Sequence, residues 1–293
     1  MNRLFFTLLA IGTALSLSAQ TRVYQTFKDT WIINTRSTET TQRGHMDIRI
    51  GHRFGDFAGE LGGWETLFGL ENAQDVMIGL DYGIKDNLTV GLNRTKGAGP
   101  LRQLVNTSLK WRFMDQMDDG SRPFSAAFVG LWSISTMKSS ENPESLSRFD
   151  DFAHRMIYNA QVLVARKFSP GFSLQFSAGY THRNVVPFNE ENGTVNVGLA
   201  SRIQLSKMFG LIFDLSLPLN GIQNPFEEET LTNAKHYAPF GIGLEMETGG
   251  HVFQFNLTNS RGLMETDYIP NTTSNWFDGQ YRLGFTISRL FKV

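Results

Sequence analysis

The chain has 293 residues, of which 27 are Lys or Arg and 28 are Asp or Glu, so its net charge is −1. A chain without a basic excess lacks the electrostatic footprint of nucleic-acid binding, and nucleic acid is not an expected partner. The absence of cysteine excludes disulfides, thiolate catalysis, zinc sites with cysteine ligands and N-terminal cysteine lipidation. After the N-terminal segment the longest apolar run is Ala126 to Trp132, far below the roughly 18 residues of a membrane-spanning helix.

The first segment has the layout of a secretory signal. Arg3 precedes the apolar stretch Leu4 to Leu17, and the small residues Ser18 and Ala19 lead into polar sequence. A basic start, an apolar middle and a small-residue exit are typical of a signal peptide, which is removed on export. We therefore expect residues 1–19 to be a signal peptide and the mature protein to be exported.

Residues 20–43 precede the first regular pattern and carry the apolar cluster Trp31-Ile32-Ile33. A disordered lead-in is one interpretation of this segment. Three large apolar side chains instead favour docking against the rest of the protein. Two placements remain open for a docked segment, inside the fold formed by the following residues or at its periplasmic rim.

From residue 44 to the C-terminus the dominant pattern is an alternation of apolar with polar or small residues. Met46 and Ile48 share one parity, and Asp47 and Arg49 share the other. Period two indicates a strand with two unlike faces, because successive side chains point to opposite sides of a sheet. About twelve segments show such strand patterns, and the one over residues 124–133 is small or apolar on both faces.

The connections between these strands alternate in length. Tight turns lie near residues 85–87, 169–171, 207 and 248–250, whereas long loops cover residues 55–74, 136–153, 220–238 and 260–278. With an even number of strands, this alternation places both termini and all tight turns at one rim, as in outer-membrane barrels with periplasmic turns. The sequence therefore predicts an all-β fold, a closed antiparallel transmembrane β-barrel of about twelve strands over residues 44–293, with its termini on the periplasmic side.

The predicted inner face carries charged side chains of both signs. They are Asp47, Arg49, Arg53, Asp81, Lys110, Arg112, Arg202, Asp214, Glu245 and Arg282. In an open lumen these residues would line a pore of weak ion preference, and in a closed lumen they would pair across the interior without conducting. Barrels of eight strands fill with side chains and barrels of sixteen or more leave channels, so about twelve strands lie between the two cases. Both alternatives remain open, with a slight preference for a narrow or plugged lumen.

The C-terminal strand carries a second indication. Gly284, Phe285, Ile287 and Phe291 form a glycine followed by alternating apolar residues and a near-terminal aromatic. This pattern resembles the closing strand of outer-membrane barrels, which the barrel-assembly machinery recognises. The resemblance implies an assembly signal at these four positions, although Phe291 is third from the end instead of last.

Four further stretches resemble an uncharacterised family of bacterial outer-membrane β-barrel proteins, a domain of unknown function. They are TFKDTWIIN (residues 26–34), GHMDIRIGHRFG (44–55), FGLENA (68–73) and IGLDYGIKDNLTVG (78–91). The resemblance covers nearly all of the mature chain. It implies a barrel exported by a Gram-negative bacterium to its outer membrane, and it brings no established activity.

Enzymatic chemistry has little support in the sequence. The six histidines form neither an i, i+2 pair on one strand face nor a HExxH pattern. A barrel phospholipase pairs a histidine with a serine and an asparagine, and His182 and Asn184 lack a serine two residues from the histidine. We therefore expect no enzymatic activity, no metal and no cofactor.

The predicted function is that of an outer-membrane β-barrel protein, either a small channel or a structural and interaction barrel. Its expected partners are the lipids of the outer membrane and the barrel-assembly machinery. Two alternatives remain, a soluble periplasmic β-barrel that binds an apolar ligand and the barrel phospholipase. The sequence indicates no particular solute, loop partner or oligomeric state.

Overall fold

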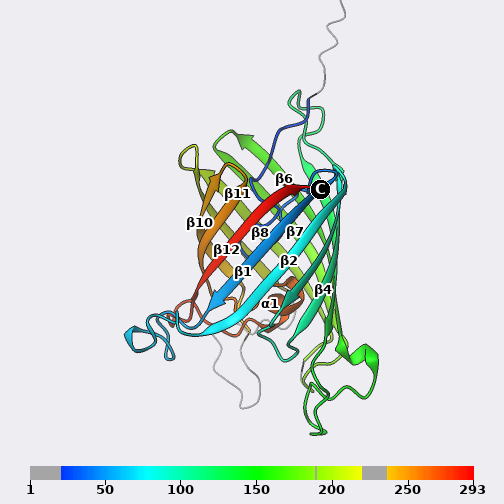
Figure 1. Ribbon diagram of the computed structural model, residues 1–293, viewed down its shortest axis with the longest axis vertical. Helices are drawn as coiled ribbons and strands as arrows, with labels where there is room; N and C mark the ends of the chain where they lie inside the picture. Colours follow the sequence, from blue (N-terminus) through cyan, green and yellow to red (C-terminus); the bar gives the residue numbers. More distant parts are fainter. Residues whose placement is uncertain (1–20, 189, 220–235) are drawn as a thin grey trace, which may run out of the picture.

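A closed antiparallel barrel of twelve strands forms the body of the protein (Figure 1). The computed structural model describes residues 21–188, 190–219 and 236–293. In chain order the strands are β1 (His45–Phe54), β2 (Ala73–Lys85), β3 (Leu88–Thr95), β4 (Leu104–Met114), β5 (Ser125–Ser135), β6 (Met156–Ser169), β7 (Phe172–Arg183), β8 (Gly193–Gln204), β9 (Phe209–Pro218), β10 (Phe240–Thr248), β11 (His251–Thr258) and β12 (Arg282–Lys292). Each strand pairs with its neighbours in sequence, and β12 pairs with β1 to close the barrel. The predicted fold class and strand number are confirmed.

Within the described residues, three short helical segments lie in the connections between strands. They are the 3-10 helices η1 (Trp64–Thr66) and η2 (Phe152–Arg155) and the α-helix α1 (Glu265–Asn271). No helix in the described part of the chain has the length and apolar character needed to cross a membrane. The sequence predicts only a long loop over residues 260–278, so α1 is a finding of the structure.

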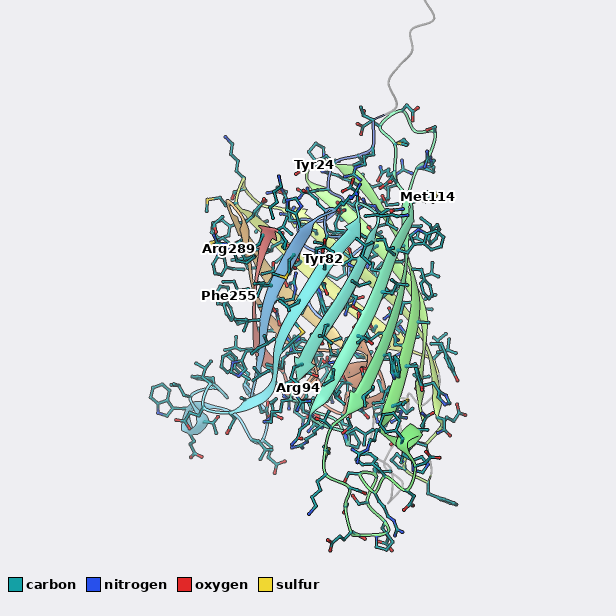
Figure 2. All side chains as sticks on the ribbon, turned by 45° about the vertical axis from the view of Figure 1, so that its right-hand side comes forward. Tyr24, Tyr82, Arg94, Met114, Phe255 and Arg289 are labelled. Carbon is teal, nitrogen blue, oxygen red and sulfur yellow. The ribbon has the colours of Figure 1, made fainter. Side chains whose placement is uncertain are left out.

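The two faces of the sheet follow the predicted parity. On β2, Ile78 and Tyr82 point outward and are exposed, whereas Asp75 and Asp81 point inward and are buried. Figure 2 shows Tyr82 and Phe255 on the outer wall. The outward positions of the other strands form an exposed apolar belt that includes Ile50, Leu92, Leu109, Trp111, Trp132, Val162, Phe176, Val195, Ile203, Ile242, Leu244 and Phe255. A continuous apolar outer face is what a sheet in contact with lipid requires.

The strand that is small or apolar on both faces is explained by what lies inside the barrel. β5 turns Val129 and Leu131 inward, and both are buried. Leu131 packs in one apolar cluster with Trp31 and Met264, which belong to segments folded into the lumen. The inner face of β5 is therefore apolar because it contacts protein instead of water.

The connections sort into two ends of the barrel, as the alternation of their lengths predicts. The turn rim carries the tight turns after β2, β6 and β10, and the loop rim carries the long loops (Figure 1). The C-terminus lies at the turn rim, where Val293 N donates to the Gly44 carbonyl oxygen at 2.9 Å. The predicted signal peptide, residues 1–19, lies outside the described residues.

The seam between β1 and β12 depends on a glycine. Gly284 pairs with Arg53 across the seam, and a Cβ at position 284 would lie 2.3 Å from both the Arg53 guanidinium and the Asn256 side-chain oxygen. Gly284 thus faces the lumen, whereas the other residues of the predicted assembly signal lie on the outward parity and are partly buried, namely Phe285, Ile287 and Phe291. Recognition of this strand by the assembly machinery stays a prediction.

Candidate functional site

The N-terminal residues run inside the barrel. Residues 26–39, the N-terminal hairpin, enter from the turn rim, where Arg22 pairs with Met117. The chain then folds back on itself, with Ile32 N donating to the Thr35 carbonyl oxygen at 2.9 Å. Most side chains of the hairpin are buried, including Trp31 and Ile32. Of the two placements open from the sequence, the segment takes the one in the lumen.

A single lysine on the wall binds the backbone of the hairpin at three points. Lys110 Nζ donates to the carbonyl oxygens of Thr30, Ser37 and Glu39 at 2.9, 3.0 and 2.8 Å. Carbonyl groups taken out of water need such donors, and a charged donor makes the stronger bonds. Lys110 therefore fastens both arms of the hairpin to β4.

The tip of the hairpin is held by a carboxylate. Asp214 on β9 accepts from the backbone N–H groups of Asn34 and Thr35 at 2.6 and 2.9 Å, and from the Asn34 side chain at 2.8 Å. Arg53 Nη2 on β1 donates to the Asn34 side-chain oxygen at 2.9 Å. The tip is thus held by β9 and by β1, which lie four strands apart around the barrel.

Ion pairs attach the arms of the hairpin to the wall. The Arg49 guanidinium donates to both Asp29 carboxylate oxygens, and its Nη2 also donates to Asp47 at 2.9 Å. On the returning arm, Arg112 lies 3.5 Å from the Glu39 carboxylate. Buried charges of this kind are tolerated only when paired, because an unpaired charge would carry the whole cost of desolvation.

A second segment fills the lumen from the loop rim. Residues 260–274, the α1 segment, fold inward between β11 and β12, and residues 265–270 of the helix are all buried. Asp267 accepts from the backbone N–H groups of Ala98 and Gly99, both at 2.8 Å, and Leu263 N donates to Asp75 on β2 at 2.9 Å. Burial raises the pKa of the Asp267 carboxyl above its usual value. Figure 1 shows α1 within the barrel near the loop rim.

The two segments meet inside the barrel. Arg36 of the hairpin lies 3.3 Å from the Glu265 carboxylate of α1, and its guanidinium stacks over the Trp31 ring at 4.3 Å. Trp31 packs with Leu263 and Met264 of the α1 segment. Polar and apolar contacts together join the hairpin to the α1 segment inside the barrel.

All ten charged residues predicted on the inner face are buried inside the barrel. Six of them contact the hairpin, namely Arg49, Arg53, Asp81, Lys110, Arg112 and Asp214. The other four bind wall or loop residues: Asp47 pairs with Arg49, Arg202 pairs with Glu245 at 2.6 Å, and Arg282 donates to Ser274 at 2.8 Å. Their predicted role in lining an ion path stays a prediction.

Sequence reasoning missed several residues that hold the two segments in place. The alternation of polar and apolar residues along β2 places Asp75 on the inward face, and this is the only sequence pattern that indicates its position. Asp29, Glu265 and Asp267 lie outside the alternating strands, and their partners are far away in sequence. No local pattern marks such residues.

Open space remains between the hairpin and the wall at the turn rim. A cavity of about 190 Å³ lies there, lined among others by Lys28, Asp29, Glu39, Arg112 and Glu247. Lys28 pairs with Glu247 at 2.9 Å across this space. The cavity forms a charged vestibule of both signs that ends at the hairpin.

Comparison with known proteins agrees with this architecture. No curated protein matches the chain. The model of one sequence family matches residues 27–291, and its description is "Membrane bound beta barrel domain (DUF5777)". The COG4313 outer membrane channel from Pseudomonas putida F1 is similar at 11% sequence identity and a TM-score of 0.50, over 88% of this chain and 100% of that chain. The NanC porin is similar at 10% identity and a TM-score of 0.46, over 85% of this chain and 100% of that chain. At these identities the likeness to solved structures concerns the fold.

Proposed function

Because the chain belongs to the membrane-bound β-barrel domain family and forms an outer-membrane β-barrel, we propose that it is a small channel for water-soluble solutes. Two of its own segments, the N-terminal hairpin and the α1 segment, hold the channel closed. The long loops then face the outside of the cell and the turn rim faces the periplasm, as in other barrels of this membrane.

The observation that carries this proposal is the polar wall behind the hairpin. Lys110, Asp214 and Arg49 are charged side chains that point into the lumen and bind the hairpin. When the hairpin leaves, water and ions can replace its carbonyl and N–H groups around these charges. A lumen lined by charges of both signs is suited to hydrated solutes and not to apolar ones.

The nature of the hairpin contacts supports a reversible closure. Hydrogen bonds exchanged for bonds to water contribute little net free energy each, on the order of 1 kcal/mol, and charged groups contribute somewhat more. The buried side chains of Phe27, Trp31, Ile32 and Ile33 add apolar contacts to these bonds, so the docked state is favoured and undocking into the vestibule at the turn rim is rare. The vestibule beside Asp29 and Glu39 gives water access to the base of the hairpin.

A second function is favoured by the contact between the two segments. Arg36 with Glu265, and Trp31 with Met264, join the hairpin to α1 in the middle of the barrel. A permanently filled barrel would use these contacts for rigidity and would serve as a structural or interaction barrel. This alternative predicts that the lumen never conducts.

Conductance in planar lipid bilayers separates the two functions. One variant lacks residues 21–41, a second has residues 262–272 replaced by a short glycine-serine linker, and a third combines both changes. We expect rare or no current steps for the intact mature protein and stable steps for the combined variant. Heat-modifiable migration on gels shows that each barrel is folded.

A matched control removes residues 139–147 from the loop between β5 and β6. Figure 1 shows this loop outside the barrel at the loop rim, so its removal should leave the conductance unchanged. If the combined variant folds but produces no current steps, the channel proposal is wrong and the structural barrel is favoured. If the loop deletion alone opens the pore, the hairpin and α1 are not the closing elements.

We further propose that the protein has no enzymatic activity. Asn184 Nδ2 donates to the Ala153 carbonyl oxygen at 2.7 Å, and the His182 ring lies beside Tyr180 at 6.3 Å between centroids. These contacts join the β7 end to the neighbouring loop. Absence of esterase activity in the purified protein would agree with this proposal, and activity lost in His182→Ala would contradict it.

The remaining partners are also proposals. The apolar belt fits the hydrocarbon of the outer membrane, and β12 fits recognition by the barrel-assembly machinery. Loss of membrane insertion in cells after removal of Phe291 is the expected result if the C-terminal strand is the assembly signal.

A further inference from the structure

The connection between β1 and β2 leaves the barrel sideways. Residues 55–72 extend outward from the wall at the loop rim, roughly across the barrel axis, in both views (Figures 1 and 2). The loop between β5 and β6 instead continues along the axis, away from the barrel (Figure 1). The β1–β2 loop is therefore placed beside the barrel, over the region that surrounds its outer wall.

This loop exposes an unusual number of large apolar side chains. Leu61 and Trp64 are each 78% exposed, and Leu67, Phe68 and Leu70 are exposed as well. Single exposed apolar residues are common on protein surfaces, but a cluster of five within one loop marks an interaction surface. We call these five residues the paddle.

The loop between β1 and β2 is folded, although its apolar side chains are exposed. Phe68 N and Gly63 N donate to the carbonyl oxygens of Gly63 and Phe57 at 2.7 and 2.9 Å, and Gly55 N donates to Gly69 at 2.9 Å. Gly69 has φ +80°, and a Cβ there would lie 2.6 Å from backbone atoms of the opposite arm. The loop folds on itself and still presents its apolar side chains outward.

A row of aromatic rings connects the paddle to the barrel wall. Trp64 lies 6.3 Å from Phe68, Phe68 lies 5.2 Å from Phe57, and Phe57 lies 5.4 Å from Tyr281 at the start of β12. The row continues through Trp276 to Phe240 at the start of β10, with ring centroids 5.1 Å apart at each step. Aromatic rings at the ends of strands are typical of the level where lipid headgroups meet hydrocarbon.

We propose that the paddle rests on and enters the interfacial layer of the lipid that surrounds the barrel at the loop rim. Leu61 and Trp64 would insert, and the exposed carboxylates Glu60, Glu65 and Glu71 would stay at headgroup level in water. The sideways direction of the loop and its continuity with the apolar belt and the aromatic row place these side chains beside lipid, whether or not the lumen conducts.

The other candidate occupants of this surface are a second copy of the chain and a different protein. A lipid surface is favoured because the apolar belt of the barrel lies directly beside the loop, and because five exposed apolar side chains on one loop have the composition of an interfacial membrane anchor. Interfacial binding of this kind scales with the apolar area inserted, so each large side chain contributes.

The absence of cysteine in the sequence makes the test direct. Leu61→Cys is labelled with an environment-sensitive nitrobenzoxadiazole probe and reconstituted at low protein density into phosphatidylcholine vesicles, with or without lipid that carries a doxyl quencher high in the acyl chain. Phe176→Cys in the belt and Glu144→Cys on the axial loop are the lipid-exposed and water-exposed controls. Folding of each variant is checked by heat-modifiable migration.

We expect the probe at position 61 to emit at shorter wavelength than the probe at 144 and to lose intensity with doxyl lipid, as the probe at 176 does. Adding Trp64→Ser and Leu67→Ser should move the position-61 emission toward that of the water-exposed control. Emission at 61 that matches position 144 and is quenched by aqueous iodide would overturn the proposal. If the probe at position 61 is shielded from water only at high protein density in the lipid, the surface binds a second copy of the chain. This result would also overturn the proposal.

Discussion

Replacing Lys110 by methionine should release the N-terminal hairpin from the wall. Methionine keeps the length of the side chain and cannot donate, so the carbonyl groups of Thr30, Ser37 and Glu39 lose the amine that they share. When the hairpin is undocked, these carbonyl groups bind water. When the hairpin is docked in the variant, they lack the donor that Lys110 supplies, so the docked state is destabilised. The substitution therefore acts on the docking equilibrium of the hairpin more than on the barrel itself.

The magnitude follows from the number and kind of bonds. A hydrogen bond to a charged group contributes about 1.5–3 kcal/mol, and three bonds to one amine are not additive. A net loss of about 3 kcal/mol raises the undocked population on the order of 100-fold, since about 1.4 kcal/mol corresponds to a factor of ten.

Thiol labelling measures this population. Ser37 is fully buried in the hairpin, so a cysteine there reacts with a water-soluble maleimide only after undocking. When redocking is fast, the labelling rate is proportional to the undocked population. The rate for Ser37→Cys should therefore rise on the order of 100-fold when Lys110→Met is added.

The matched control is Lys207→Met, on the exposed turn between β8 and β9, which should leave the rate unchanged. Both proteins must keep heat-modifiable migration, so that a faster reaction does not reflect an unfolded barrel. An unchanged labelling rate in a folded Lys110→Met barrel would refute the role assigned to this amine.

Three further substitutions test other parts of the structure. Trp31→Ala removes the ring shared by the hairpin and the α1 segment and should lower the free energy of unfolding in detergent by about 3–5 kcal/mol, measured by denaturant titration. Gly284→Leu should abolish the heat-modifiable form, because a Cβ at position 284 would lie 2.3 Å from Arg53. The control Gly130→Ala should fold, because no atom lies nearer than 3.4 Å to a Cβ at position 130. Equal yields of the two folded variants would contradict the packing at the seam. Burial raises the pKa of the Asp267 carboxyl above its ordinary value of 3.8, so its stabilising contribution is present at low pH and is lost as the pH rises through the folded pKa. The thermal midpoint of the wild type should accordingly fall relative to that of Asp267→Asn as the pH rises above 3.8, and a constant difference would contradict this assignment.

The barrel wall could be predicted from the sequence because the face of each strand residue depends only on its neighbours. Asp81 and Lys110 each lie opposite in parity to apolar residues on either side, and both point into the lumen. A period-two pattern is local, so it survives without knowledge of the partner strand. Short and long connections alternate along the chain, so their order also predicts which connections lie at each rim.

The contents of the lumen could not be predicted in the same way. Asn34 and Asp214 are 180 positions apart, and Ala98 and Asp267 are 169 positions apart. Contacts of this range leave no periodic trace in the chain. The apolar cluster Trp31-Ile32-Ile33 and the strand β5 with two apolar faces were the sequence signals for a filled lumen, and the structure brings Trp31 into contact with Leu131 of β5.

A reversible tether between the hairpin and the barrel wall tests whether the hairpin closes a conducting lumen. A Cβ at position 241 would lie 2.9 Å from the Ile33 side chain, so Ile33→Cys and Gly241→Cys are within reach of a disulfide. The pair is placed in a protein that carries Lys110→Met and the linker in place of residues 262–272, and single-channel current is recorded before and after dithiothreitol. We expect a silent barrel while the disulfide is formed and stable current steps after its reduction. Current that is the same in both states, or absent in both from a folded barrel, would contradict it.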